Sequence, residues 1–134
     1  METARTEEES RSAEPTVLIV DDDAATRTLL RTILEGMSVP CRVHEAENSE
    51  MALRIARATH IDLVLLDIVL PGSGASGVLV CQELCKDSRT RVVIVTGSTS
   101  EPILDACLSA GAVECVRKPF ALDEVRNRAK EWLS

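Results

Sequence analysis

Short, continuous apolar runs alternate with segments of helical periodicity along most of this sequence. The clearest runs are Val17–Val20, Leu63–Leu66 and Val92–Val95, which consist of valine, leucine and isoleucine. Such runs predict strands covered on both faces, because a strand with one solvated face alternates apolar with polar residues. They are also far too short to cross a bilayer. The pattern therefore favours an α/β fold around a buried sheet.

The segments between these runs complete a regular order of strands and helices. Strands are predicted at Val17–Val20, Cys41–Glu45, Asp62–Asp67, Arg91–Thr96 and Val113–Arg117. Helices are predicted at Asp23–Glu35, from a cap at Asn48 to Thr59, at Val78–Lys86, at Glu101–Ala110 and at Leu122–Leu133. In the last helix, the residues predicted to face inward are Leu122, Val125, Ala129 and Trp132. Connections this short require right-handed crossovers. We therefore expect a doubly wound, five-stranded parallel sheet flanked by five helices.

The first fifteen residues differ in composition from the rest. Residues 1–15 are rich in Glu, Ser and Arg, so they are predicted to be a disordered acidic tail before one domain at 16–134. This start is unlike a secretory signal, which favours a cytoplasmic protein. A net charge of −7 disfavours binding to nucleic acid or to anionic membranes.

The five cysteines are odd in number and have no disulfide spacing, so they are predicted to be reduced, mostly buried residues. Cys81 and Cys85 are expected to share a helix face, but two thiolates alone make a poor metal site.

Polar side chains stand where four of the predicted strands end. They are Asp21, Asp22 and Asp23 after the first strand, Asp67 after the third, Thr96 and Gly97 at the fourth, and Lys118 after the fifth. The carboxyl ends of parallel strands meet at one rim, where ligands bind in such sheets. Crowded carboxylates repel each other, and their hard oxygens suit Mg²⁺, with Mn²⁺ as a substitute. The rim is thus a candidate site for a divalent ion and a phosphoryl group.

Each of these residues also has a simpler explanation. The aspartate triplet can cap a helix, Thr96 is an ordinary strand residue, and Lys118 can be a solvated side chain. Asp67 is harder to explain, because an acid that ends a buried run is costly to leave unpaired. Their coincidence at one rim favours the functional interpretation.

From Thr16 onward the sequence resembles the receiver domain of two-component response regulators. The resemblance lies in VLIVDDD, DLVLLDIVLPG, VVIVTGS and CVRKPF, in the family's order and near its spacing. It implies a flavodoxin-like fold and a signalling switch rather than an enzyme. Asp67 would accept a phosphoryl group from a histidine kinase or a histidine phosphotransfer protein.

The resemblance also implies roles for the neighbouring residues. Asp21, Asp22, Asp67 and the backbone carbonyl of Val69 would hold Mg²⁺. The Thr96 hydroxyl would move to the phosphoryl group, and Lys118 would be its counter-charge. Gly97 would leave room for the donor, and the Lys118–Pro119 peptide is expected to be cis.

Two departures from the family pattern concern the output. Cys115 stands where an aromatic residue is usual. The loop at 72–77 is rich in glycine, and it can be a mobile lid, a contact with a partner or a tolerated insertion. Neither Val69 nor Ser98 can position hydrolytic water through an acid or amide, which predicts a slowly hydrolysing phosphoaspartate.

The candidate output face comprises Leu104, Leu108, Val113 and Cys115, with both leucines predicted to be exposed and with Ile103, Ala106 and Cys107 predicted to face the core. The family uses this helix–strand–helix face for downstream proteins and self-dimers.

Three alternatives remain at this stage. The chain can be a receiver fragment of a longer regulator or hybrid kinase. A haloacid dehalogenase-type phosphatase also uses an aspartate nucleophile, but it needs an acid two residues later, where Val69 stands. A pseudo-receiver scaffold is disfavoured by the intact set of acids, Thr96 and Lys118.

Overall fold

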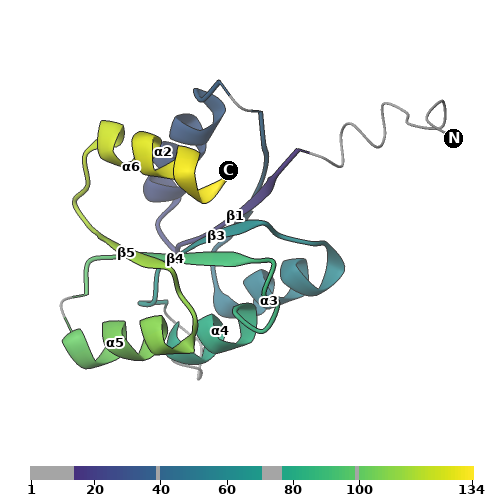
Figure 1. The fold of residues 1–134 in the computed structure, drawn as a ribbon. Coiled ribbons are helices and arrows are strands. Elements are labelled where there is room, and N and C mark those ends of the chain that lie inside the picture. Colours follow the sequence, from purple (N-terminus) through teal and green to yellow (C-terminus); the bar gives the residue numbers. More distant parts are fainter. Residues whose placement is uncertain (1–13, 39, 71–76, 99) are drawn as a thin grey trace, which may run out of the picture.

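Five parallel strands form one sheet in the order β2-β1-β3-β4-β5 in the computed structural model, which describes residues 14–38, 40–70, 77–98 and 100–134 (Figure 1). The strands are β1 (Thr16–Val20), β2 (Arg42–Ala46), β3 (Leu63–Leu66), β4 (Arg91–Thr96) and β5 (Glu114–Arg117). The helices are α2 (Ala24–Glu35), α3 (Ser49–Ala58), α4 (Gly77–Leu84), α5 (Glu101–Ala110) and α6 (Leu122–Trp132). The predicted fold is therefore confirmed. Most of the predicted tail and of the glycine-rich loop lies outside the described residues.

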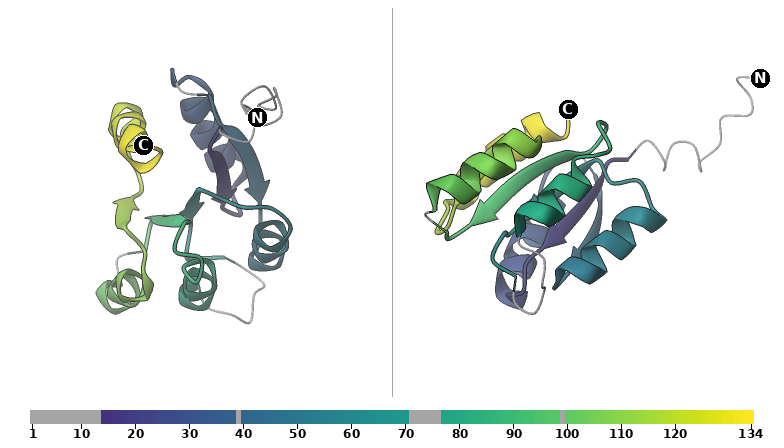
Figure 2. Two further views of the ribbon diagram at one scale, coloured as in Figure 1. Left: turned by 45° about the vertical axis from the view of Figure 1, so that its right-hand side comes forward. Right: turned by 90° about the horizontal axis from the view of Figure 1, so that it is seen from below.

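The helices form two layers, with α2 and α6 on one face of the sheet and α3, α4 and α5 on the other (Figures 1 and 2). Alternate residues of the central strands feed the two cores: Leu18 and Val20 pack toward α3–α5, while Val17 and Ile19 pack toward α2 and α6. This double coverage explains why the central strands are continuous apolar runs. No helix in the described parts of the chain is long and apolar enough to span a bilayer.

The helix starts follow the capping residues in the sequence. Asp23 caps α2 by accepting from the Ala25 N–H, and Asn48 caps α3 by accepting from the Met51 N–H. Strand β5 begins one residue later than predicted, although the Val113 N–H still donates to the Val92 carbonyl at 2.8 Å.

Two predictions of inward-facing residues were wrong. Leu122 is 45% exposed, because it is the first residue of α6 and helical side chains lean toward the amino end, here beyond the helix. In α5, Leu104 is buried and Ile103 is 41% exposed, the reverse of the prediction. Apolar residues surround most of this helix, so their periodicity did not fix its rotation.

Candidate functional site

Strand register places the first and third strand ends side by side. Val20 and Leu66 are partners in the parallel pairing of β1 with β3, so Asp21 and Asp67 follow adjacent positions. The Asp67 N–H donates to the Val20 carbonyl at 2.9 Å, which fixes the backbone of Asp67 beside β1. The two carboxylates therefore emerge at the same rim from the centre of the sheet.

Lys118 connects these two acids from the edge strand. Its Nζ donates to Asp21 Oδ2 at 2.7 Å and to Asp67 Oδ2 at 2.9 Å. The side chains of Asp21 and Asp67 are 2% and 7% exposed, against 24% for Lys118. Burial alone would lower the pKa of Lys118, but the hydrogen bonds to Asp21 and Asp67 outweigh it and raise this pKa above its usual value. The ammonium is therefore charged at neutral pH.

The other carboxylate oxygen of Asp67 is held from β4 and from its own loop. Asp67 Oδ1 accepts from the Thr96 hydroxyl at 2.9 Å and from the Val69 N–H at 2.9 Å. The Thr96 oxygen in turn accepts from the Ser98 N–H at 3.2 Å. Thr96 thus couples Asp67 to the segment that leads toward α5.

The three consecutive aspartates have three different environments. Asp23 is the helix cap, and its second oxygen accepts from the Thr26 hydroxyl at 2.8 Å. Asp21 Oδ1 accepts from the Asp23 N–H at 2.9 Å, while the Asp22 side chain is exposed. Helix capping therefore explains Asp23 and leaves Asp21 and Asp22 for another purpose.

The acidic cluster fits a hard divalent cation. Asp21, Asp22 and Asp67 each offer a carboxylate oxygen, and these oxygens lie within 4.8 Å of one another. The cluster carries three negative charges against the single ammonium of Lys118, so an additional cation would relieve repulsion. Carboxylates in this number are ligands that Mg²⁺ accepts.

Two further predictions concern the backbone around the cluster. The Lys118–Pro119 peptide is cis, as predicted. Gly97 is exposed beside Thr96, and a Cβ added there would meet no atom within 4 Å. There is thus open space next to Thr96.

Comparison with known proteins decides the family. Residues 17–130 match the family model described as the response regulator receiver domain. The chain belongs to this family. Receiver domains of two-component response regulators are signalling switches and in general not enzymes.

Individual relatives agree with this assignment. The receiver domain is 33% identical over 120 residues to the transcriptional regulatory protein ResD of Bacillus subtilis, covering 90% of this chain and 48% of that protein. It is 36% identical over 114 residues to the KDP operon transcriptional regulatory protein KdpE of Escherichia coli, covering 85% of this chain and 49% of that protein. The chain spans about half the length of these curated relatives.

Solved structures show the same fold. A CheY-like response regulator receiver domain protein from Methanospirillum hungatei superposes with a TM-score of 0.81 at 27% identity, covering 90% of this chain and 94% of that chain. The BeF3-activated DrrB receiver domain superposes with a TM-score of 0.77 at 25% identity, covering 90% and 97%.

The candidate output face of the receiver domain differs from its prediction. Leu108 is 43% exposed and Val113 is 52% exposed, whereas Cys115 is half-buried. Leu104 does not belong to this surface, because it packs in the core under the sheet. The apolar part of the face is therefore Leu108 and Val113.

Sequence reasoning missed one residue that shapes the site. Arg27 Nη1 donates to the backbone carbonyl of Asp21 at 2.7 Å, while its Nε donates to Glu45 Oε1 at 3.1 Å. Arg27 lies one helical turn after the cap Asp23, and this spacing was the only available indication. The arginine fixes the strand end from which Asp21 projects.

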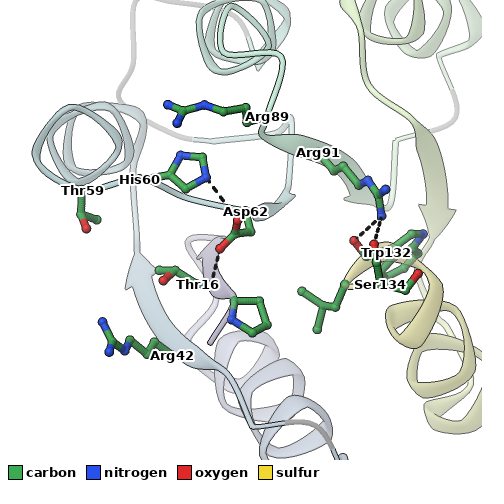
Figure 3. Close-up of a pocket in the computed structure, with 11 residues that line it drawn as sticks. Thr16, Arg42, Thr59, His60, Asp62, Arg89, Arg91, Trp132 and Ser134 are labelled. Carbon is green, nitrogen blue, oxygen red and sulfur yellow. Dashed lines mark hydrogen bonds and ion pairs between the residues drawn. The ribbon is translucent and has the colours of Figure 1, made fainter. Parts of the chain in front are cut away.

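A cavity of about 460 Å³ lies at the opposite end of the sheet from these residues (Figure 3). Its charged groups are engaged in structural contacts: Arg91 Nη1 donates to the carbonyl of Trp132 at 2.7 Å, and Asp62 accepts from the Thr16 N–H at 2.8 Å. Arg89, which also lines the cavity, forms an ion pair with Asp87, which does not line it. This cavity joins strand starts to the end of α6 and is not the candidate site.

Proposed function

We propose that this receiver domain, residues 16–134, is a switch that accepts a phosphoryl group on Asp67 with Mg²⁺. A histidine kinase or histidine phosphotransfer protein would be the donor. The observation that carries the proposal is the bridge of Lys118 between Asp67 and Asp21 within a cluster of excess negative charge. Held by Asp21, Asp22, Asp67 and the Val69 carbonyl, Mg²⁺ would supply positive charge for the phosphoryl oxygens, and Mn²⁺ would supply the same.

The chain's own residues account for the transfer step. A carboxylate oxygen of Asp67 attacks the phosphorus, the bond from phosphorus to the donor imidazole breaks, and its electron pair stays on that nitrogen. Lys118 faces the charge that develops on the phosphoryl oxygens. Because these groups are already held at strand ends, little reorganisation is needed during the reaction.

Thr96 supplies the conformational response. Its hydroxyl now donates to Asp67 Oδ1 and would donate to a phosphoryl oxygen instead. The Ser98 N–H, which donates to the Thr96 oxygen, would move with it. The segment between β4 and α5 is thereby pulled toward the rim, and α5 shifts as a body because packed helices move between discrete arrangements. Downstream proteins or a second copy would bind at α5–β5–α6, through Leu108 and Val113 with Cys115 at its margin.

The proposed switch differs from an aspartate-nucleophile phosphatase at one position. The second acid of such an enzyme is replaced by Val69, whose side chain is 59% exposed. With neither Val69 nor Ser98 able to activate water, we expect a long-lived phosphoaspartate. ResD and KdpE are about twice as long as this chain, and by analogy we propose that it serves as the receiver module of a longer regulator.

Intact-mass measurement tests the acceptor. Acetyl phosphate or phosphoramidate with Mg²⁺ should add one phosphoryl group to the wild type, and Asp67→Asn should abolish this addition. Asp62→Asn, at the other end of the same strand, is the matched control and should be labelled like the wild type. Labelling of the Asp67→Asn variant at the wild-type level would remove Asp67 from the role.

The output face has a separate test. Beryllofluoride, which stands in for the phosphoryl group on Asp67, should change the sedimentation coefficient or the affinity for a partner. Leu108→Asp combined with Val113→Asp should remove this change while leaving phosphorylation intact. A double variant that still responds would place the output elsewhere on the domain.

A further inference from the structure

Two thiols are in contact at the end of α4, that of Cys81 within the helix and that of Cys85 just after it. Helix α4 lies in the layer that it forms with α3 and α5 (Figure 2). Cys81 Sγ and Cys85 Sγ are 3.9 Å apart, one helical turn from each other. Cys81 is fully buried and Cys85 is half-buried, so the pair is reached from solvent through Cys85. The two sulfurs therefore form a dithiol with one accessible member.

The dithiol lies where α4 meets the end of α5. The Cys81 thiol donates to the Cys107 carbonyl at 3.7 Å. Gly111, at the end of α5, has a φ of 125°, and a Cβ added there would lie 3.1 Å from Cys85 Cβ and 3.3 Å from its Sγ. The side chain of Cys85 thus packs directly against the turn between α5 and β5.

A direct disulfide suits this pair poorly. Residues four apart on a helix have Cβ atoms about 5–6 Å apart, whereas a disulfide needs about 3.5–4.5 Å. Burial raises the pKa of both the Cys81 and the Cys85 thiol, which keeps them protonated at neutral pH. Protonated thiols react slowly with peroxides and are weak ligands for metal ions, because both reactions require the thiolate.

An electrophile that bridges both sulfurs and carries its own base avoids both obstacles. A bridging atom spans the gap that a disulfide cannot, and a hydroxide on that atom can remove the thiol proton. A trivalent arsenic compound that carries one organic group and two hydroxides, R–As(OH)2, has these properties. In the reaction two As–O bonds break, two As–S bonds form, and each thiol proton leaves with a hydroxide as water, without any change in oxidation state.

We propose that Cys81 and Cys85 form a binding site for trivalent arsenic compounds, independent of the phosphorylation site. Bridging would fix the Cys85 side chain toward Cys81 and alter its contact with Gly111. The turn that follows α5 would therefore sense the bound arsenical. This gives the domain a second chemical input to the helix that Thr96 addresses from its other end.

Phenylarsine oxide is a suitable probe. The reduced, folded protein is treated with one equivalent, challenged with excess glutathione, and analysed by intact mass. A monothiol adduct is displaced by glutathione, whereas a two-thiol adduct survives, because the second bond forms intramolecularly and tightens binding on the order of 10²-fold or more. The wild type should retain one phenylarsenic group and lose it to a competing dithiol.

Matched cysteine variants locate the site. Cys85→Ser and Cys81→Ala should each lose the glutathione-resistant adduct, while Cys41→Ser, on the other face of the sheet, should retain it. Circular dichroism establishes that each variant is folded, and the arsenical should raise the melting temperature of the wild type but not of Cys85→Ser. Retention of the adduct by folded Cys85→Ser, or its loss in Cys107→Ser, would overturn the two-thiol assignment.

Discussion

Both ends of the sheet gather charged side chains, but they use them differently. At the amino end, Arg91 donates to backbone carbonyls at the end of α6, and Asp62 accepts a backbone N–H. At the carboxyl end, the single ammonium of Lys118 faces three carboxylates that lie within 4.8 Å of one another. Charges at the first end complete secondary structure, whereas those at the second leave an excess of negative charge.

This difference distinguishes the two ends of the sheet by the balance of their charges. The cavity of about 460 Å³ lies at the amino end, where the charged groups are already engaged (Figure 3). A cluster with an excess of negative charge attracts a cation, either alone or bound to another group, because binding relieves the repulsion between the carboxylates. The comparison can be tested by making the same change at each end.

The largest contrast is expected between Lys118→Met and Arg91→Met. Without Mg²⁺, Lys118→Met should lower the free energy of unfolding by about 3 kcal/mol, because two buried carboxylates lose their counter-charge. Arg91→Met should cost about 1 kcal/mol, since it removes hydrogen bonds to carbonyls that are exposed or only partly buried and leaves no buried charge unpaired. Urea denaturation measures both. Equal losses of unfolding free energy in the two variants would show that repulsion between the carboxylates does not make the rim more dependent on its cation than the amino end.

The second contrast concerns Mg²⁺. At a concentration a hundredfold above its dissociation constant, Mg²⁺ should stabilise the wild type by about 2.7 kcal/mol, because it binds the native state. Asp22→Ala should abolish most of this gain, and Asp62→Ala should keep it. Thermal melts with and without the ion decide the matter, and an identical shift in both variants would exclude the acidic cluster as the site.

Two threonines offer a finer comparison. Thr96 donates to Asp67 at the rim, and Thr90 donates to the Ile61 carbonyl at 2.6 Å near the amino end. Thr90→Val removes one hydrogen bond and should cost about 1 kcal/mol, whereas Thr96→Val removes the bonds to Asp67 and to the Ser98 N–H and should cost about 2 kcal/mol. Only Thr96→Val should also weaken the response to beryllofluoride in sedimentation. A matching loss of response in Thr90→Val would mean that the effect is one of stability alone.

The smallest effect is a pH dependence at the amino end. The side-chain hydrogen bond from Arg89 lowers the pKa of Asp87 to about 2, and the nearby His60 adds to this effect. Since the folded pKa lies below the unfolded one, this contribution is present above about pH 4 and is lost as the pH falls toward 2. Asp87→Asn should flatten that part of the stability curve in low salt. An unchanged slope would show that the exposed pair contributes nothing measurable.

The order of elements and the meeting of Asp21, Asp67, Thr96 and Lys118 could be predicted, because strand ends in a parallel sheet converge by geometry. The rotation of α5 could not, since apolar side chains occur on most of its circumference and only contact with α4 and the sheet buries Leu104. The bridge that Lys118 makes between two carboxylates was also beyond the sequence. Asp21 is 97 residues away, and nothing local indicates that it shares the ammonium with Asp67.

The position of each strand within the sheet determines how often it opens locally, and β3 and β5 differ in this respect. Strand β3, which presents Asp67, is paired on both sides, whereas β5, which presents Lys118, is an edge strand paired only with β4. Edge elements exchange their amide hydrogens through local opening, while central strands exchange only when the whole domain unfolds. The ammonium of Lys118 can therefore leave and return many times while the Asp67 carboxylate stays in place. We expect the amides of β5 to exchange faster than those of β3 and to slow down if a phosphoryl group engages Lys118.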